Sequence, residues 1–198
     1  YISLLPNGNI RIFNFKEELI SKYCLNCCME KLFSLIKTYY DFPKKGIAFK
    51  DLLGITQDSE VFRQLILNMS SNKIIKNSEA IISIDARGFI FGSAISFQAS
   101  KPMIVARKPG KLPGELTEEK YNLEYGNDSL SIQSEALEKF NSYAIVDDLL
   151  ATGGTANCVA KLIHKKGKKI TGLLTVIELV ELNGRSKLDF SVDSILSM

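Results

Sequence analysis

Hydrophobic positions change their spacing along the chain, and each spacing predicts a different element. From Phe15 to Tyr39 apolar residues recur at helical intervals, which predicts one or two amphipathic helices. A loop is expected over Asp41–Gly46, whose proline and glycine would interrupt a helix. A further helix should run from Ser59, as its N-cap, to about Met69.

After this region the pattern changes to short runs that are hydrophobic along their whole length. Strands are predicted at Ala80–Asp85, Met103–Ala106, Tyr143–Val146 and Ile170–Ile177. Helical spacing separates them, most clearly at Gly88–Ala99. Uniformly apolar strands that alternate with helices are typical of a parallel sheet covered on both faces. The fold class is therefore α/β, with a parallel central sheet flanked by helices.

Composition narrows the possible classes of protein. The 198 residues are 45% hydrophobic and 24% charged, which excludes a disordered chain and suits roughly one domain. A net charge of +3 is too small to indicate nucleic-acid binding. No apolar run approaches the roughly 18 residues of a membrane helix, and the first residues lack the pattern of a signal peptide.

The cysteines raise the question of a metal site. Cys24 and Cys27 form a C-x-x-C pair, but only Cys28 and the distant Cys158 accompany them, and His164 is the single histidine. A structural zinc site needs a second ligand pair at similar spacing. We therefore assign no metal site and interpret these cysteines as small apolar residues in a reducing compartment.

The strongest chemical signal lies at Tyr143–Ala156. A buried strand is followed by two carboxylates, a glycine-rich turn at Ala151–Thr155 and a helix from about Thr155. Glycines let a backbone approach a ligand closely, and a helix N-terminus attracts a phosphate. The lysine and the spacing of a Walker A loop are missing. The turn is predicted to bind a phosphate at the carboxyl edge of the sheet.

Asp147 and Asp148 precede this turn and would repel a phosphate. They suit the vicinal hydroxyls of a sugar, or a hydrated Mg²⁺. An acidic turn that caps a helix remains the alternative.

The sequence of Val146–Thr155 resembles the phosphoribosyl pyrophosphate motif of type I phosphoribosyltransferases, in the form found in the adenine-specific branch. The similarity extends over roughly residues 40 to 190 and includes, besides Val146–Thr155, the segments Asp41–Asp51, Ile84–Gly92, Ala106–Glu115, Leu123–Gly126, Val176–Leu179 and Gly184–Leu188. The Arg-Lys-Pro-Gly-Lys-Leu-Pro-Gly and Leu-Glu-Tyr-Gly wording makes the resemblance specific to the adenine branch.

The resemblance implies how the sugar diphosphate is bound. The 5′-phosphate would lie on Ala151, Thr152, Gly153, Gly154 and Thr155, and the ribose on Asp147 and Asp148. The pyrophosphate would contact Asp85, Ala86, Arg87, Arg107, Lys108 and Lys111, with a cis peptide between Asp85 and Ala86. Taken alone, Arg87 could be a surface residue that opens a helix. The polar stretch Pro109–Tyr121 is expected to be a mobile lid, although a solvated charged loop is the simpler explanation.

The resemblance also assigns the base side. Ala48, Phe49, Lys50 and Leu179 would surround the adenine, with Lys50 in place of the arginine that is common in the family. Glu124 would be the catalytic residue, either stabilising charge on the ribose or exchanging a proton with the base. Tyr125 would belong to the lid, or be merely structural.

The resemblance implies a Mg²⁺-dependent, purine-salvage enzyme that converts adenine and phosphoribosyl pyrophosphate to AMP and pyrophosphate, with inversion at C1′ through an oxocarbenium-like transition state. Mg²⁺ would be held through the diphosphate and ribose, without direct protein ligands. We expect a cytoplasmic homodimer that binds neither nucleic acid nor membranes. Residues 1–40 would form a helical hood, and residues 41–198 the catalytic domain.

Two other functions compete with this prediction. A hypoxanthine–guanine or xanthine enzyme would share the phosphate motif but not the base-side segments. A non-catalytic regulator with the same fold would need a nucleic-acid-binding surface. The only candidate is a lysine face, made of Lys161, Lys165, Lys166, Lys168 and Lys169. A solvated helix end explains those lysines more simply.

Overall fold

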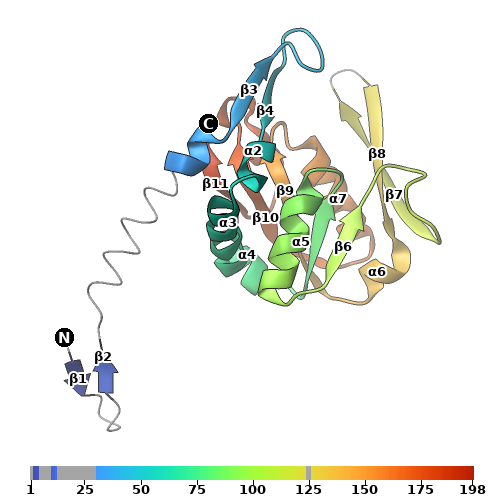
Figure 1. Ribbon diagram of the computed structural model, residues 1–198. Helices are drawn as coiled ribbons and strands as arrows, with labels where there is room; N and C mark the ends of the chain where they lie inside the picture. Colours follow the sequence, from blue (N-terminus) through green and yellow to red (C-terminus); the bar gives the residue numbers. More distant parts are fainter. Residues whose placement is uncertain (1, 5–9, 13–29, 124–125) are drawn as a thin grey trace. The chain divides into compact units, whose positions relative to one another are not determined.

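The computed structural model of the chain describes residues 2–4, 10–12, 30–123 and 126–198 (Figure 1). The chain divides into two compact units, Tyr1–Gln64 and Leu65–Met198. Helix α3 (Ser59–Ser71) spans the division in sequence. The two units are described separately below.

The first unit contains two antiparallel strand pairs. Strand β1 (Ile2–Leu4) pairs with β2 (Ile10–Ile12), and β3 (Lys37–Tyr40) pairs with β4 (Ala48–Asp51). Residues 30–34 are helical, and the short helix α2 spans Leu53–Thr56.

The prediction of a helix up to about Tyr39 is therefore wrong at its C-terminal end. Residues from Lys37 onward are extended, and Tyr39 lies opposite Phe49. The Lys50 Nζ donates a hydrogen bond to the Thr38 hydroxyl at 3.0 Å, across the same pair of strands. Helical spacing of apolar residues is a local signal, and pairing with a strand ten residues later overrides it.

Helix α3 was correctly expected, but its cap was not. The backbone N–H of Val61 donates to the Asp58 carboxylate at 3.0 Å, so Asp58 is the N-cap and Ser59 is the first helical residue. Asp58 also pairs with Lys31 at 2.6 Å. Both interactions lower the pKa of its carboxyl group, the bond with Lys31 most strongly. A carboxylate is favoured at this position by the partial positive charge of the helix N-terminus.

The second unit is built on a five-stranded sheet, which confirms the predicted fold class. The strand order is β11-β10-β9-β5-β6, and every neighbouring pair is parallel. The strands are β5 (Ala80–Ile84), β6 (Met103–Ala106), β9 (Ser142–Leu150), β10 (Lys169–Glu178) and β11 (Val192–Ser197). The central residues of β5, β9 and β10 are almost completely buried, whereas β11, at one edge of the sheet, has only partly buried and exposed residues.

The connections place the main helices on opposite faces of this sheet (Figure 1). Helix α5 (Gly88–Ala99) joins β5 to β6 in one direction, and α7 (Gly154–Lys165) joins β9 to β10 in the other. Since such crossovers are right-handed, the reversal puts the two helices on different sides. It also creates a switch point between β5 and β9, where ligands of open α/β sheets bind.

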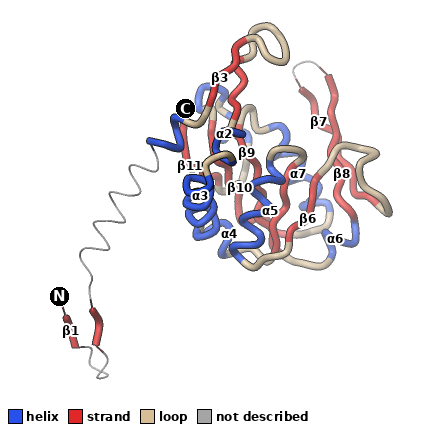
Figure 2. The backbone as a smooth tube through the Cα atoms, viewed as in Figure 1, coloured by secondary structure: helices blue, strands red, loops and turns tan. Residues whose placement is uncertain are grey.

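A long hairpin follows β6. Strands β7 (Leu116–Leu123) and β8 (Gly126–Gln133) are antiparallel, and Ser131 forms a bridge with Arg107 just beyond β6 (Figure 2). The loop expected over residues 109–121 therefore ends before Leu116. The polar residues of β7 are extended because they pair with β8, whose Leu130 and Ile132 are buried.

Short elements complete the second unit: α4 (Lys73–Lys76), α6 (Ser134–Glu138), η1 (Val180–Leu182) and η2 (Gly184–Lys187). The core lies between the sheet, α7 and β8, with Tyr143, Val159 and Leu162 among its buried side chains. Among the described residues no helix combines the length and the apolar character needed to cross a membrane.

Candidate active site

The carboxyl end of β9 leads directly into the predicted phosphate turn. Asp147 and Asp148 lie near the end of the strand, and α7 begins at Gly154 within the turn. A pocket of about 180 Å³ opens here. Its wall is made of Arg87, Asp147, Asp148, residues 149–156 and Leu173. The structure thus brings together the residues predicted to bind the 5′-phosphate and the ribose with the arginine predicted to bind the pyrophosphate.

Asp147 is wedged against the first turn of α5. A Cβ atom on Gly88 would lie 2.8 Å from Asp147 Oδ1, so only glycine allows this approach. Burial raises the pKa of Asp147 well above its ordinary value, and the charge of Asp148 raises it further. A carboxylate held at this energetic cost is a candidate for ligand binding.

Asp148 is 5% exposed and lies 2.7 Å from the Nε of Arg87, measured from its Oδ2. The pair is in ionic contact, yet within the described parts of the chain no aligned hydrogen bond reaches this oxygen. Burial raises the pKa of Asp148, and Arg87 opposes the rise. Oδ2 therefore retains the capacity to accept a hydrogen bond from a ligand hydroxyl.

The predicted pyrophosphate loop follows β5. The Asp85–Ala86 peptide is cis, as the resemblance implied. Arg107 Nε donates to Asp85 Oδ2 at 2.9 Å, and its guanidinium lies 5.7 Å from the Phe89 ring centre. Arg107 and Arg87, twenty positions apart in sequence, thus converge on one loop.

The two predicted lysines of this region lie in the turns after β6. Lys108 and Lys111 are exposed, and the Lys111 carbonyl accepts a hydrogen bond from Arg107 Nη1 at 3.4 Å. Neither lysine lines the pocket.

The predicted base-side residues fall in different units. Ala48, Phe49 and Lys50 form β4 of the first unit, where Phe49 packs edge-on against Phe42 with ring centres 5.2 Å apart. Leu179 belongs to the second unit and follows β10. Glu124 and Tyr125 lie outside the described residues.

The lysine face is not simply a solvated helix end. Lys165 pairs with Glu119 at 2.6 Å and donates to the Glu118 carbonyl at 2.8 Å. Lys166 pairs with Glu138 at 3.0 Å. Their partners lie on β7 and α6, far away in sequence, so no local pattern could have indicated these contacts.

Cys158 on α7 is buried, and its thiol lies 3.4 Å from the Glu119 carbonyl. Burial raises the pKa of this thiol to about 11. A thiol with such a pKa stays protonated at neutral pH and is a poor nucleophile. The other three cysteines lie outside the described residues.

Two glycines shape the site in ways that the motif assignments did not indicate. Gly88, in the segment that resembles the pyrophosphate loop, makes room for Asp147, and Gly184 of η2 touches the glycine-rich turn. Gly184 falls within a segment that resembles the family, but no pattern in the sequence indicates that it contacts Ala151 and Gly153.

Comparison with known proteins gives the family. Residues 57–197 match the phosphoribosyl transferase domain. The adenine phosphoribosyltransferase of Prochlorococcus marinus strain MIT 9515 is 68% identical over 167 residues, which cover 84% of this chain and 98% of the relative. That of Clostridium perfringens strain SM101 is 46% identical over 153 residues, or 77% of this chain and 89% of the relative.

Solved structures agree with these relatives. The adenine phosphoribosyltransferase of Thermoanaerobacter pseudethanolicus superposes with a TM-score of 0.80 at 38% identity, covering 86% of this chain and 99% of that one. The Saccharomyces cerevisiae enzyme, solved with adenine and an imino-altritol bisphosphate, gives a TM-score of 0.76 at 32% identity, covering 86% and 99%. With the predicted motifs gathered at the switch point of a parallel sheet, the chain belongs to the adenine phosphoribosyltransferase family.

Proposed function

We propose that this protein transfers the phosphoribosyl group of phosphoribosyl pyrophosphate to adenine, giving AMP and pyrophosphate in purine salvage. The observation that carries the proposal is one pocket in which Arg87, Asp147 and Asp148 meet the glycine-rich turn at the start of α7. An anion-binding turn beside two carboxylates suits a sugar phosphate, whose two ends differ in charge.

The 5′-phosphate is assigned to the turn formed by Ala151, Thr152, Gly153, Gly154 and Thr155. Helix α7 has twelve residues, and its first N–H groups have no partners within the helix. These donors and the helix dipole favour a bound dianion. The threonine hydroxyls add further donors.

The ribose hydroxyls are assigned to Asp147 and Asp148, and the pyrophosphate to the loop Asp85–Ala86–Arg87 with Arg107, Lys108 and Lys111. Four of these charged groups are already paired, Arg87 with Asp148 and Arg107 with Asp85. Binding of the diphosphate would give both arginines a second anionic partner. Arg87 would then contact both the diphosphate and Asp148, the proposed ligand of the ribose.

Mg²⁺ is proposed as the cofactor. Among the described residues no group of three or more His, Cys, Asp or Glu side chains could form a metal site of their own. Mg²⁺ usually keeps most of its ligands from water and substrate phosphates, so we propose that it is held through the diphosphate and the ribose. Asp147 and Asp148 would help to hold it through the ribose hydroxyls. When bound, it neutralises charge on the leaving pyrophosphate.

In the proposed reaction the bond between C1′ and the pyrophosphate oxygen breaks ahead of attack by adenine N9. The pyrophosphate leaves with the bonding electron pair, N9 bonds to C1′ from the opposite face, and the base loses its N9 proton. Positive charge builds up on the ribose in the transition state. The protein contributes by positioning both substrates and by fixed charge around the sugar.

The base is assigned to Ala48, Phe49, Lys50 and Leu179, with residues 1–40 as an N-terminal hood and residues 41–198 as the catalytic domain. The assignment rests on the resemblance of these segments to the family, and one relative, the Saccharomyces cerevisiae enzyme, was solved with adenine. Backbone groups of β4 would read the edge of the base, and so tolerate Lys50 in place of arginine.

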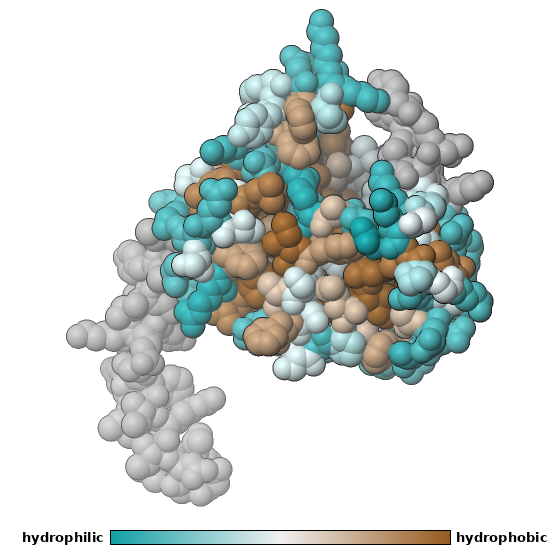
Figure 3. All heavy atoms as spheres, turned by 45° about the vertical axis from the view of Figure 1, so that its right-hand side comes forward, coloured by the Kyte–Doolittle hydropathy of each residue, from teal (hydrophilic) through white to brown (hydrophobic). Residues whose placement is uncertain are grey.

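A homodimer is proposed as the working form, located in the cytoplasm. Helix α5 is mostly apolar, and Phe97 near its end is 88% exposed. Figure 3 shows apolar side chains gathered on the surface of this side of the molecule. An exposed apolar face is a common mark of a subunit interface.

The test of the proposed function is turnover with adenine, hypoxanthine and guanine at fixed phosphoribosyl pyrophosphate, with and without Mg²⁺, followed by pyrophosphate release. Adenine should be the preferred base, and turnover should require Mg²⁺. Preference for hypoxanthine or guanine would contradict the adenine assignment. Binding of phosphoribosyl pyrophosphate without turnover of any base would instead support the non-catalytic regulator.

Glu124 is proposed as the catalytic residue. Glu124→Gln should lower kcat by about 100-fold while KM for both substrates changes much less, because its charge acts mainly in the transition state. Tyr125→Phe is the neighbouring control and should keep most of the activity. A kcat near that of the wild type for Glu124→Gln would remove this residue from the chemistry.

A further inference from the structure

The phosphate turn rests against a second backbone segment. Gly153 has a positive φ of 79°, and a Cβ atom there would lie 2.6 Å from the Gly184 carbonyl oxygen. A Cβ atom on Gly184 would lie 2.1 Å from the Ala151 oxygen and 2.9 Å from the Gly153 nitrogen. The two segments therefore touch backbone to backbone, with Gly184 packed directly against the turn.

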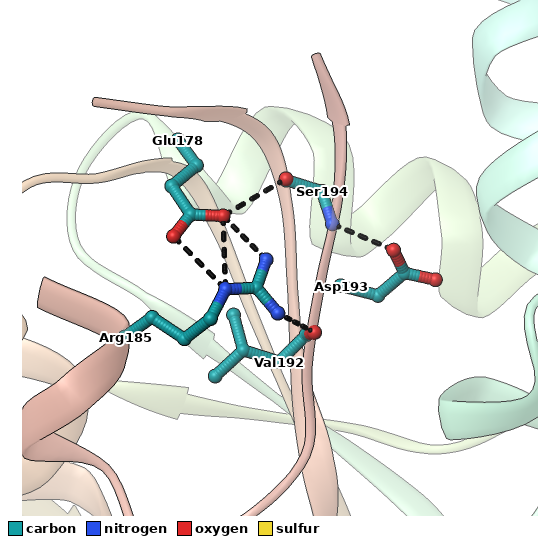
Figure 4. A network of polar contacts seen from close by, with 5 residues as sticks. All are labelled: Glu178, Arg185, Val192, Asp193 and Ser194. Carbon is teal, nitrogen blue, oxygen red and sulfur yellow. Dashed lines mark hydrogen bonds and ion pairs between the residues drawn. The ribbon is translucent and has the colours of Figure 1, made fainter. Parts of the chain in front are cut away.

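The residue after Gly184 is held by a buried carboxylate. Arg185 Nε donates to the Oε1 and Oε2 of Glu178 at 3.0 and 3.2 Å, and its Nη2 contacts Oε2 as well (Figure 4). Its Nη1 donates to the carbonyl of Val192 on β11. Arg185 thus connects the η2 segment to two strands of the sheet at once.

Glu178 is fixed independently of Arg185. It is 5% exposed, ends β10, and accepts a further hydrogen bond from the Ser194 hydroxyl at 3.3 Å. The bond with Arg185 is the main cause that lowers the pKa of Glu178, so the carboxyl group stays ionised at neutral pH. A bidentate arginine contact fixes orientation as well as distance.

We propose that Glu178 and Arg185 are positioning residues for the 5′-phosphate turn. The contact between Glu178 and Arg185 closes residues 178–185 into a loop. This loop holds Gly184 in contact with Ala151 and Gly153. The turn then keeps its N–H groups aimed at the phosphate before the substrate arrives. This inference rests on the proposed assignment of the phosphate to residues 151–155.

The same geometry predicts which substrate is affected. Leu179 is held by hydrogen bonds that do not involve Arg185: its own N–H donates to the Leu150 carbonyl at 2.9 Å, and the next N–H, of Val180, donates to the Met198 carbonyl at 2.9 Å. Loss of Arg185 should therefore loosen the phosphate turn and leave Leu179 in place. The phosphoribosyl substrate should bind more weakly, while the base should not.

The experiment uses Arg185→Lys and Arg185→Met in the full chain, with steady-state kinetics and calorimetric titration of ribose 5-phosphate. Both variants should raise KM for phosphoribosyl pyrophosphate and Kd for ribose 5-phosphate by about tenfold, the size of one lost charged hydrogen bond. KM for adenine should stay within about twofold. Lysine should fail to rescue, because it cannot form the two-pronged contact.

Two controls separate positioning from general stability. Lys139→Met breaks an exposed ion pair with Glu135 and should change neither constant. Ile75→Val shortens a fully buried side chain and should lower the melting temperature without raising KM. If Ile75→Val, at an equal loss of melting temperature, raises KM as much as Arg185→Lys does, the pair is merely structural and the proposal is wrong.

A third variant distinguishes failure of this inference from failure of the proposed function. Thr152→Val with Thr155→Val removes hydroxyl donors from the turn itself. If this double variant leaves ribose 5-phosphate binding unchanged, the phosphate assignment is wrong. If it weakens binding while both Arg185 variants bind normally, the phosphate assignment stands and only the positioning role is overturned.

Discussion

At the scale of single residues, the site contains two buried carboxyl groups that make folding less favourable. Asp147 is packed against Gly88 and beside Asp148, and both carboxyl groups have raised pKa values because of burial. Among the described residues of the pocket wall, Arg87 is the one cation, and it is in ionic contact with Asp148. Such an arrangement costs stability in the unliganded protein and is retained where ligand binding needs it.

The first prediction concerns Asp147. The pKa of Asp147 is higher in the folded than in the unfolded state. The folded protein therefore loses stability as the pH rises above the ordinary pKa of an aspartate and through the raised one. Asp147→Asn should therefore melt at a higher temperature than the wild type at pH 7, by about 2–4 °C for each kcal/mol gained. The difference should shrink as pH falls, because the native carboxyl group takes up its proton.

The same variant should bind phosphoribosyl pyrophosphate about tenfold more weakly, because an amide accepts a sugar hydroxyl less strongly than a carboxylate does. Differential scanning calorimetry between pH 4 and 8 and isothermal titration measure the two effects. Asp189→Asn, at a position outside the pocket wall, is the control. Unchanged affinity for Asp147→Asn would count against the ribose assignment.

At the scale of elements, helix α7 links two parts of the proposed site. Its N-terminus belongs to the phosphate turn, and its last turns hold strand β7 through Lys165, which pairs with Glu119. The bond with Lys165 is the main cause that lowers the pKa of Glu119. Strand β7 leads directly to residues 124–125, where the proposed catalytic glutamate lies in sequence. Lys165 therefore holds strand β7, which directly precedes Glu124 in the sequence.

The second prediction follows from this contact. Lys165→Met should lower kcat by about two- to fivefold, since a partly exposed ion pair contributes up to about 1 kcal/mol. Raising the salt concentration should lower wild-type kcat toward the variant, because salt screens the pair. Lys169→Met, an equal change of charge on an exposed lysine, should leave kcat unchanged. Equal losses in both variants would show a general effect of charge.

At the scale of the whole molecule, the net charge of +3 hides a division of sign within the second unit. Arginines gather at the loop after β5, and carboxylates at the end of β9. The switch point of the sheet brings these two strand ends side by side. A nearly neutral protein can therefore have a site with cations on one side and carboxylates on the other, as the proposed binding of a diphosphate and a sugar requires.

The third prediction tests the proposed dimer. Phe97→Glu places a charge on the exposed apolar end of α5 and should shift the protein to a monomer in size-exclusion chromatography with light scattering. Leu67→Glu, at another exposed apolar position, should leave the oligomeric state unchanged. A Phe97→Glu protein with the wild-type mass would exclude this face as the interface.

Much of the fold could be predicted from local patterns. Buried strands appear as continuous apolar runs, so β5, β6, β9 and β10 were found within a few residues of their ends. The extended conformation of residues 37–40 and of β7 could not be found in this way. Both depend on a partner strand elsewhere in the chain, which no local spacing encodes.

The sequence by itself determined the alternation of strands and helices, the glycine-rich turn and the two carboxylates before it, because each of these features is encoded by neighbouring residues. Only the tertiary structure decided which charges meet. The contacts of Arg87 with Asp148, of Arg107 with Asp85 and of Arg185 with Glu178 join residues that the crossovers and turns bring together. Their energies depend on distance and burial in space, and neither quantity can be read from positions along a chain.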